Sequence, residues 1–178
     1  MTKISDVTAF VFQNPDYWLE LLAGADYPDG LSADETAALE GARDHVERQV
    51  TEMLHVCGAK LPVANASVYA RKFKGASTAK NRSVTLYPVP SIAGKLYRVE
   101  FGLDTAGDGA SVQLYASIVV KKGYLDTLRT NLSTAGTAHS VDNYYVYAPG
   151  VSLTANAGLE GIADQAVSAM CKLLDAVK

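Results

Sequence analysis

A group of basic and aromatic residues in the middle of the chain is the first that could do chemistry. Its members lie between positions 69 and 82: Tyr69, Arg71, Lys72, Phe73, Lys74, Lys80 and Arg82. In the strand that we predict over residues 67–74, alternate residues share a face, so the two aromatic rings lie with Arg71 on one side. Such a surface could stack bases and contact phosphates, and tyrosine and arginine also dominate many protein–protein interfaces. The segment is therefore our candidate binding surface, and tyrosines that simply pack within a sheet are the other interpretation.

Three carboxylates form a second candidate group. Glu100 and Asp104 lie on the polar face of a strand predicted over residues 95–104, and Asp108 follows in the next loop. A metal-dependent nuclease could place acids on adjacent strands, but the returning strand offers Gln113 and Tyr115, with neither an acid nor a lysine there. We favour a strand face whose charges discourage edge pairing. A small metal-dependent enzyme with dispersed carboxylates is kept as an alternative.

The histidines and cysteines do not form a recognisable catalytic or metal-binding pattern. His45 and His55 fall on one predicted helix, about 80° apart around its axis and more than two turns apart along it. Cys57 and Cys171 lie on or beside apolar helical stripes, as structural thiols do. Neither a nucleophile elbow nor a phosphate-binding loop is present in the sequence. We therefore predict no catalytic residue, no metal ligand and no cofactor, and favour a protein that is not an enzyme.

Charge is unevenly distributed along the 178 residues, whose net charge is −3. Residues 1–60 hold eleven acids against four bases, whereas residues 61–100 hold seven bases against one acid. The acidic balance argues against a dedicated duplex-DNA-binding protein, because phosphate contacts normally make such a domain basic. An acidic helical part could instead meet a basic surface on another protein.

Two helices are predicted at the N-terminus. The first covers about residues 5–23, where Pro15 can break or restart it. The second begins at a capping box formed by Ser32 and Glu35, and Gly58 is placed to end it. Its apolar residues recur at steps of three and four: Leu39, Ala42, Val46, Val50, Met53, Leu54 and Cys57.

After residue 62, apolar and polar residues alternate instead of recurring at helical spacing. Strands are predicted in succession over residues 67–74, 83–89, 95–104, 110–121 and 144–147. A short helix over about 124–132 and a loop over 133–142 precede the fifth strand, and an amphipathic helix over 157–177 follows it. One apolar face is predicted for the third and fourth strands: Tyr97, Val99, Phe101, Leu103, Val112, Leu114, Ala116, Ile118 and Val120.

This order of elements predicts the α+β class. We expect a single domain over residues 1–178, with an acidic helical part in 1–60 and the sheet plus C-terminal helix in 61–178. The N-terminal helical pair precedes an antiparallel sheet of about four to five strands, and the C-terminal amphipathic helix packs on that sheet.

For function, we expect a non-enzymatic protein-binding module with a protein partner and no cofactor. Small acidic proteins without an active site are often inhibitors or adaptors, and phage-encoded inhibitors of nucleic-acid-processing defence systems are an analogy. The first alternative is a single-stranded nucleic-acid-binding protein that uses residues 67–82. Because no apolar run approaches the ~18 residues of a membrane span and no secretory signal is visible, we expect a soluble cytoplasmic protein without membrane association.

Overall fold

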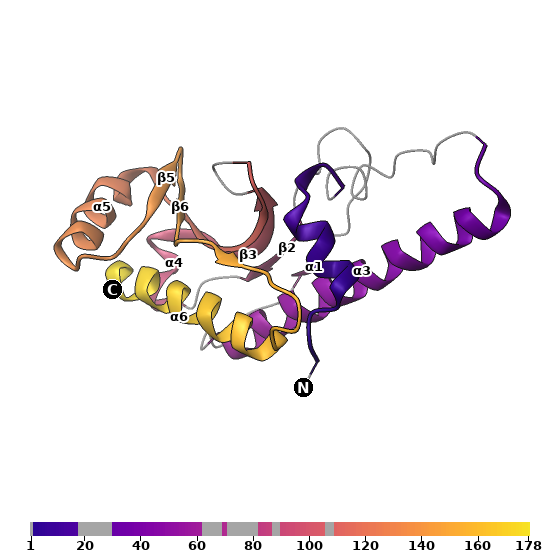
Figure 1. The fold of residues 1–178 in the computed structure, drawn as a ribbon. Coiled ribbons are helices and arrows are strands. Elements are labelled where there is room, and N and C mark those ends of the chain that lie inside the picture. Colours follow the sequence, from indigo (N-terminus) through magenta and orange to yellow (C-terminus); the bar gives the residue numbers. More distant parts are fainter. Residues whose placement is uncertain (1, 18–29, 62–68, 71–81, 87–89, 106–108) are drawn as a thin grey trace.

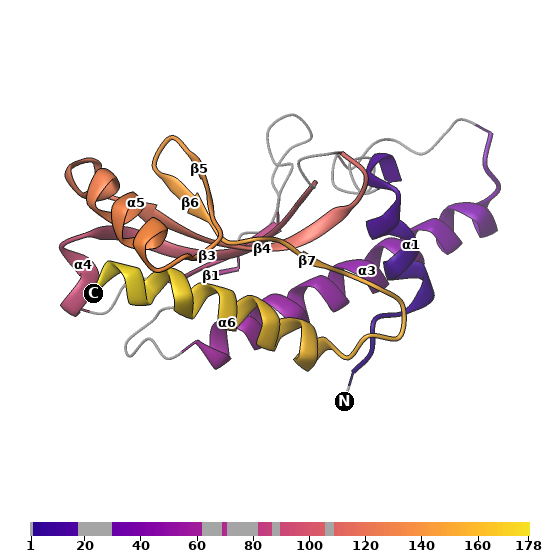
Figure 2. The ribbon, with the colours of Figure 1, turned by 60° about the vertical axis from the view of Figure 1, so that its left-hand side comes forward.

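Two long helices, α3 (Ala33–Lys60) and α6 (Leu159–Val177), lie together on one face of an antiparallel sheet (Figure 1). Figure 2 shows the same two layers from a second direction, with the sheet on one side and both helices on the other. The computed structural model describes residues 2–17, 30–61, 69–70, 82–86, 90–105 and 109–178. The predicted α+β class is confirmed, with the C-terminal helix packed on the sheet.

The N-terminal helices begin and end at residues that their capping chemistry explains. Helix α1 (Asp6–Gln13) begins after Ser5, whose hydroxyl accepts a hydrogen bond from the Thr8 amide. It ends before Pro15, and residues 15–17 are helical again, which confirms the predicted interruption. The predicted residues 18–23 of this helix lie outside the described residues.

Helix α3 confirms the predicted capping box of Ser32 and Glu35. Gly58, in contrast, does not end this helix, which runs on to Lys60. Leu61 is buried in the core just beyond it, and Lys60 Nζ lies 2.7 Å from Asp164 Oδ1 on α6. We attribute the additional turn to these two contacts, which outweigh the low helix propensity of glycine.

In the part of the chain that the structure describes, the sheet contains seven strands, all paired antiparallel. Their order is β1-β2-β3-β4-β6-β5, with β7 beside β4. Five of them are three residues or longer, in line with the predicted four to five. The strands are β1 (Tyr69–Ala70), β2 (Arg82–Leu86), β3 (Leu96–Thr105), β4 (Val112–Val120), β5 (Ser140–Asp142), β6 (Tyr145–Tyr147) and β7 (Val151–Ser152). The predicted residues 71–74 and 87–89 of the first two strands lie outside the described residues.

The alternation predicted for β3 and β4 is confirmed with one exception. Phe101 and Ile118 are fully buried beneath the two helices, as are their inward-facing neighbours. Tyr97 was predicted on this face but is 59% exposed. Leu96 pairs with Val120 and Arg98 with Val119, so Tyr97 is an extra residue in a β-bulge and Leu96 takes the inward position.

Shorter elements connect the C-terminal half. Helix α4 (Pro90–Ala93) precedes β3, and the 3-10 turn η1 (Lys122–Tyr124) leads from β4 into α5 (Leu125–Thr134). Residues 133–142 were predicted as a loop, but Ser140–Asp142 form strand β5. This strand pairs with β6 across a turn where Asn143 has a φ of 51°. Within the described residues, no helix combines the length and hydropathy that crossing a membrane requires.

Candidate functional site

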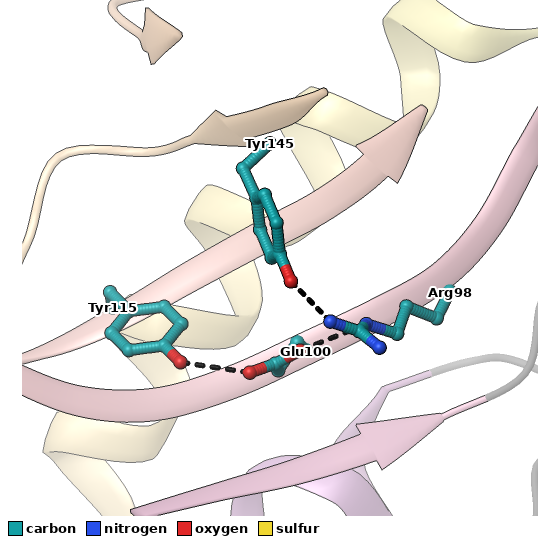
Figure 3. Close-up of polar contacts among 4 residues, drawn as sticks. All are labelled: Arg98, Glu100, Tyr115 and Tyr145. Carbon is teal, nitrogen blue, oxygen red and sulfur yellow. Dashed lines mark hydrogen bonds and ion pairs between the residues drawn. The ribbon is translucent and has the colours of Figure 1, made fainter. Parts of the chain in front are cut away.

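A cluster of polar and aromatic side chains lies on the sheet face opposite α3 and α6 (Figure 3). Strand register positions it, because Glu100 on β3 pairs with Ser117 on β4, which pairs with Tyr147 on β6. The neighbouring row brings Arg98 next to Val119 and Val119 next to Tyr145. Two consecutive strands, β3 and β4, and the later strand β6 therefore build one surface. We call it the tyrosine cluster: Arg98, Glu100, Tyr115, Ser117, Tyr145 and Tyr147.

Glu100 is the centre of this cluster and is only 7% exposed. Its Oε1 accepts a 2.9 Å hydrogen bond from Tyr115 Oη, and its Oε2 lies 3.2 Å from Arg98 Nε (Figure 3). The Arg98 contact is an ion pair without the alignment of a hydrogen bond at Nε. A buried carboxylate needs such partners, since an isolated charge in a low-dielectric interior is costly.

Aromatic contacts extend the cluster across β4 to β6. Arg98 Nη2 donates to Tyr145 Oη (Figure 3), and the guanidinium lies 5.5 Å from the centroid of the same ring. The rings of Tyr145 and Tyr147 stack with centroids 5.8 Å apart, and Tyr147 meets Tyr115 edge to face at 5.6 Å. These geometries are those that aromatic pairs prefer.

Tyr115 and Tyr147 of this cluster are held in their neutral form. Burial, and then the charge of Glu100, raise the pKa of Tyr115 far above its ordinary value. Burial, followed by the neighbouring Tyr145, raises the pKa of Tyr147 to about 12. Both tyrosines are therefore hydrogen-bond donors at neutral pH. With its two oxygens already engaged, Glu100 is better suited to joining β3 to β4 than to a role in catalysis.

The structure does not bring the predicted carboxylates into one site. Glu100 and Asp104 face the same side of β3 four residues apart, which corresponds to about 13 Å at ~3.3 Å per residue. Asp104 is exposed and Asp108 lies outside the described residues. Across the described ranges, histidine, cysteine and carboxylate side chains form no group of three or more that could hold a metal ion.

Most of the predicted basic and aromatic binding surface is not described. Tyr69 lies in β1 and Arg82 in β2, where the register pairs Tyr69 with Thr85. The other five residues of that prediction lie outside the described residues: Arg71, Lys72, Phe73, Lys74 and Lys80. This surface remains a prediction.

A second surface, not predicted from the sequence, lies on and just after α1. Val7, Phe10 and Tyr17 are 47%, 53% and 54% exposed, and the rings of Phe10 and Tyr17 lie 5.4 Å apart. We call these three residues the aromatic patch. The opposite side of α1 buries Phe12 and Ala9 in the core. Helix α1 is apolar on two sides, and only one of them can face the core. Apolar residues on both sides are therefore the sequence signal from which an exposed patch could have been predicted.

Polar contacts with α3 position the segment just before α1, the helix that carries the aromatic patch. The side chain of Gln49, 8% exposed, accepts a 3.1 Å bond from the Ser5 amide and donates a 2.7 Å bond to the Lys3 carbonyl. His45 Nε2 lies 2.8 Å from Ser5 Oγ, the same hydroxyl that caps α1. These bonds determine where α1 begins and which side it presents outward.

The stretch of sequence that carries the aromatic patch is acidic. Asp6 and Asp16 flank the patch, and both are exposed. Residues 4–42 contain eight aspartates and glutamates and no lysine, arginine or histidine.

Neither a protein-family model nor a curated protein nor a solved structure matches this chain. The chemistry of these surfaces is therefore the basis for a functional proposal.

Proposed function

We propose that the protein is a non-enzymatic protein-binding module that docks its aromatic patch on a basic surface of another protein. The observation that carries this proposal is the exposure of three large apolar side chains, two of them aromatic rings in contact, on one side of α1. Aromatic side chains bury ~150–250 Å² each when covered, and clustered apolar exposure of this kind is typical of interaction sites. The rings are anchored by a capped helix, which limits the entropy lost on binding.

The charge around the patch supports a protein partner rather than a nucleic acid. An acidic surface attracts a basic one and steers its approach, whereas it repels the phosphate backbone. Proteins that process nucleic acids carry basic surfaces, which an acidic, aromatic patch could occupy in place of their substrate. The proposed role is accordingly that of a cytoplasmic inhibitor or adaptor for such a protein, as in phage-encoded inhibitors of defence systems.

The proposal is tested by affinity purification from nuclease-treated lysate of the native host, followed by quantitative mass spectrometry. The double variant Phe10→Ala/Tyr17→Ala should lose the captured partner by ~30-fold or more, as expected when hot-spot residues worth ~2 kcal/mol are removed. Tyr144→Ala is the matched control, because Tyr144 is also exposed, at 41%, but lies in the β5–β6 turn. Equal capture by the double variant and the control would contradict the proposal.

The nucleic-acid alternative makes a different prediction. Labelled single-stranded DNA or RNA would bind with an affinity that falls steeply with salt, because each neutralised phosphate releases counterion. That binding would disappear in the Arg71→Ala/Lys72→Ala/Lys74→Ala variant and persist in Phe10→Ala/Tyr17→Ala. Fluorescence anisotropy at ~50 and ~200 mM salt separates the two functions.

A further inference from the structure

The N-terminal part of α3 is a projecting arm that the rest of the described structure does not cover. Every residue from Ser32 to Gly41 is exposed except Thr36, which is half-buried, and Val46 is the first buried residue of the helix. Figures 1 and 2 both show this end of α3 extending beyond the sheet and α6. At ~1.5 Å per residue the exposed segment is about 15 Å long.

The arm carries an unused continuation of the core-facing stripe of α3. Val46, Val50 and Met53 are buried on that stripe, and one of the next positions toward the N-terminus is Leu39, which is 43% exposed.

Residues four apart lie on the same helix face, so Glu35 and Arg43 flank Leu39 one turn to either side. Thr36 and Ala42, both short side chains, complete this face. An isolated helix as short as this arm is only marginally stable without tertiary packing. Packing of its exposed face against a partner would therefore stabilise it.

We infer that this arm pairs antiparallel with the arm of a second copy of the chain, with Leu39 at the two-fold axis. Leu39 then meets Leu39 of the second copy. Since Glu35 and Arg43 are equally far from Leu39, each Glu35 lies opposite Arg43 of the other copy, and Thr36 lies opposite Ala42. A two-fold interface requires a self-complementary surface of this kind. Both capping bonds of Glu35 end on Oε2, which leaves Oε1 for the guanidinium.

The pairing is expected to be weak and concentration-dependent. Exposed ion pairs contribute little to association, and a single leucine pair adds modest apolar burial. Small residues between them let the two helices approach closely. The arm is a different surface from the aromatic patch, and its test uses purified protein alone. The result of that test is therefore independent of the proposed function.

Sedimentation equilibrium of the purified protein, from ~1 to ~500 μM, measures the association directly. We expect the average mass to rise toward that of a dimer, and Leu39→Glu to keep it at the monomer value because two charges would meet at the axis. Ala37→Glu is the matched control, since Ala37 is exposed on another face of the same turn, and it should still dimerise. A monomer at every concentration, or a dimer unaffected by Leu39→Glu, overturns the inference.

A charge exchange tests the antiparallel register. Arg43→Glu places like charges opposite each other, as does Glu35→Arg, so each variant alone should associate ~10-fold or more weakly than the parent. Mixing the two variants restores both opposite-charge pairs, and the mixture should form a heterodimer. Circular dichroism of each variant checks that the helix persists after the capping glutamate is replaced. Association of the mixture no stronger than that of either variant alone would overturn this register.

Discussion

Tyr115 and Glu100 join neighbouring strands of the sheet through a 2.9 Å hydrogen bond from the phenol to the carboxylate. With Arg98 on the other oxygen, this bond lets a charged group persist at 7% exposure on the sheet face away from the helices. The bond crosses the register diagonally, since Tyr115 pairs with Gly102 and Glu100 with Ser117. It therefore depends on the strand pairing and in turn stabilises that pairing.

Removal of the phenol should destabilise the fold. Tyr115→Phe leaves one oxygen of a buried carboxylate without its donor, and we expect the free energy of unfolding to fall by ~1–3 kcal/mol. Ser117→Ala is the matched control, because the buried Ser117 hydroxyl makes no hydrogen bond to any described residue. Its loss should therefore be neutral or slightly stabilising. Denaturant titration compares the two, and an equal effect of both would contradict the assigned role of the bond.

Alkaline pH should weaken the protein through the same cluster. The folded pKa of Tyr147, about 12, lies above its ordinary value of 10.0, and that of Tyr115 is raised further. A raised pKa favours the neutral phenol in the folded state, so this stabilisation is complete below pH 10 and is lost as the pH rises toward 12. The difference in tyrosinate absorbance between the parent and Tyr147→Phe should show that Tyr147 ionises only as the pH approaches 12. Ionisation of Tyr147 near pH 10 in the folded protein would contradict this prediction.

Two glycines should respond to alanine in opposite directions. A Cβ on Gly150 would lie 2.2 Å from Gln113 Oε1 and 3.1 Å from Gln113 Cβ, so Gly150→Ala should destabilise by ~1–3 kcal/mol. Replacing Gln113 by alanine in the same chain should relieve the clash. Gly41 lies inside α3 with open space around it, so Gly41→Ala should raise helix stability by ~0.5–1 kcal/mol. Thermal unfolding of the three variants measures both effects.

The two cysteines should differ in reactivity. Cys57 is fully buried, and burial raises the pKa of its thiol to about 12. Cys171 is half-buried, and burial raises its pKa as well. Because the thiolate is the reactive form, a soluble alkylating reagent at neutral pH should label Cys171 slowly and leave Cys57 unlabelled until the protein unfolds. Rapid labelling of Cys57 in the folded protein would show that the α3–α6 interface opens readily.

Local patterns predicted the elements that have strong periodicity or capping chemistry. The Ser32–Glu35 capping box, the alternation of β3 and β4, and the apolar stripe of α6 each appear in the structure as expected. Strand β5 was missed because three residues carry too little alternation, and its pairing depends on the left-handed turn at Asn143.

The candidate sites were harder to predict, for physical reasons. The tyrosine cluster depends on the register of three strands, which no local pattern determines. The bulge that exposes Tyr97 depends on an extra residue between two paired positions. The aromatic patch depends on which side of α1 faces the core. Tertiary contacts decide that, among them those of Gln49 and His45 with the N-terminal segment.

Photo-crosslinking from position 10 shows directly whether the aromatic patch binds a protein. A benzoylphenylalanine introduced at Phe10 in the native host would react with whatever covers the aromatic patch, and the same residue at Tyr144 serves as the control. We expect position 10, and not position 144, to crosslink to a protein, and the crosslinked peptide to be rich in lysine and arginine. Crosslinks to nucleic acid alone, or the same protein from both positions, would contradict this expectation.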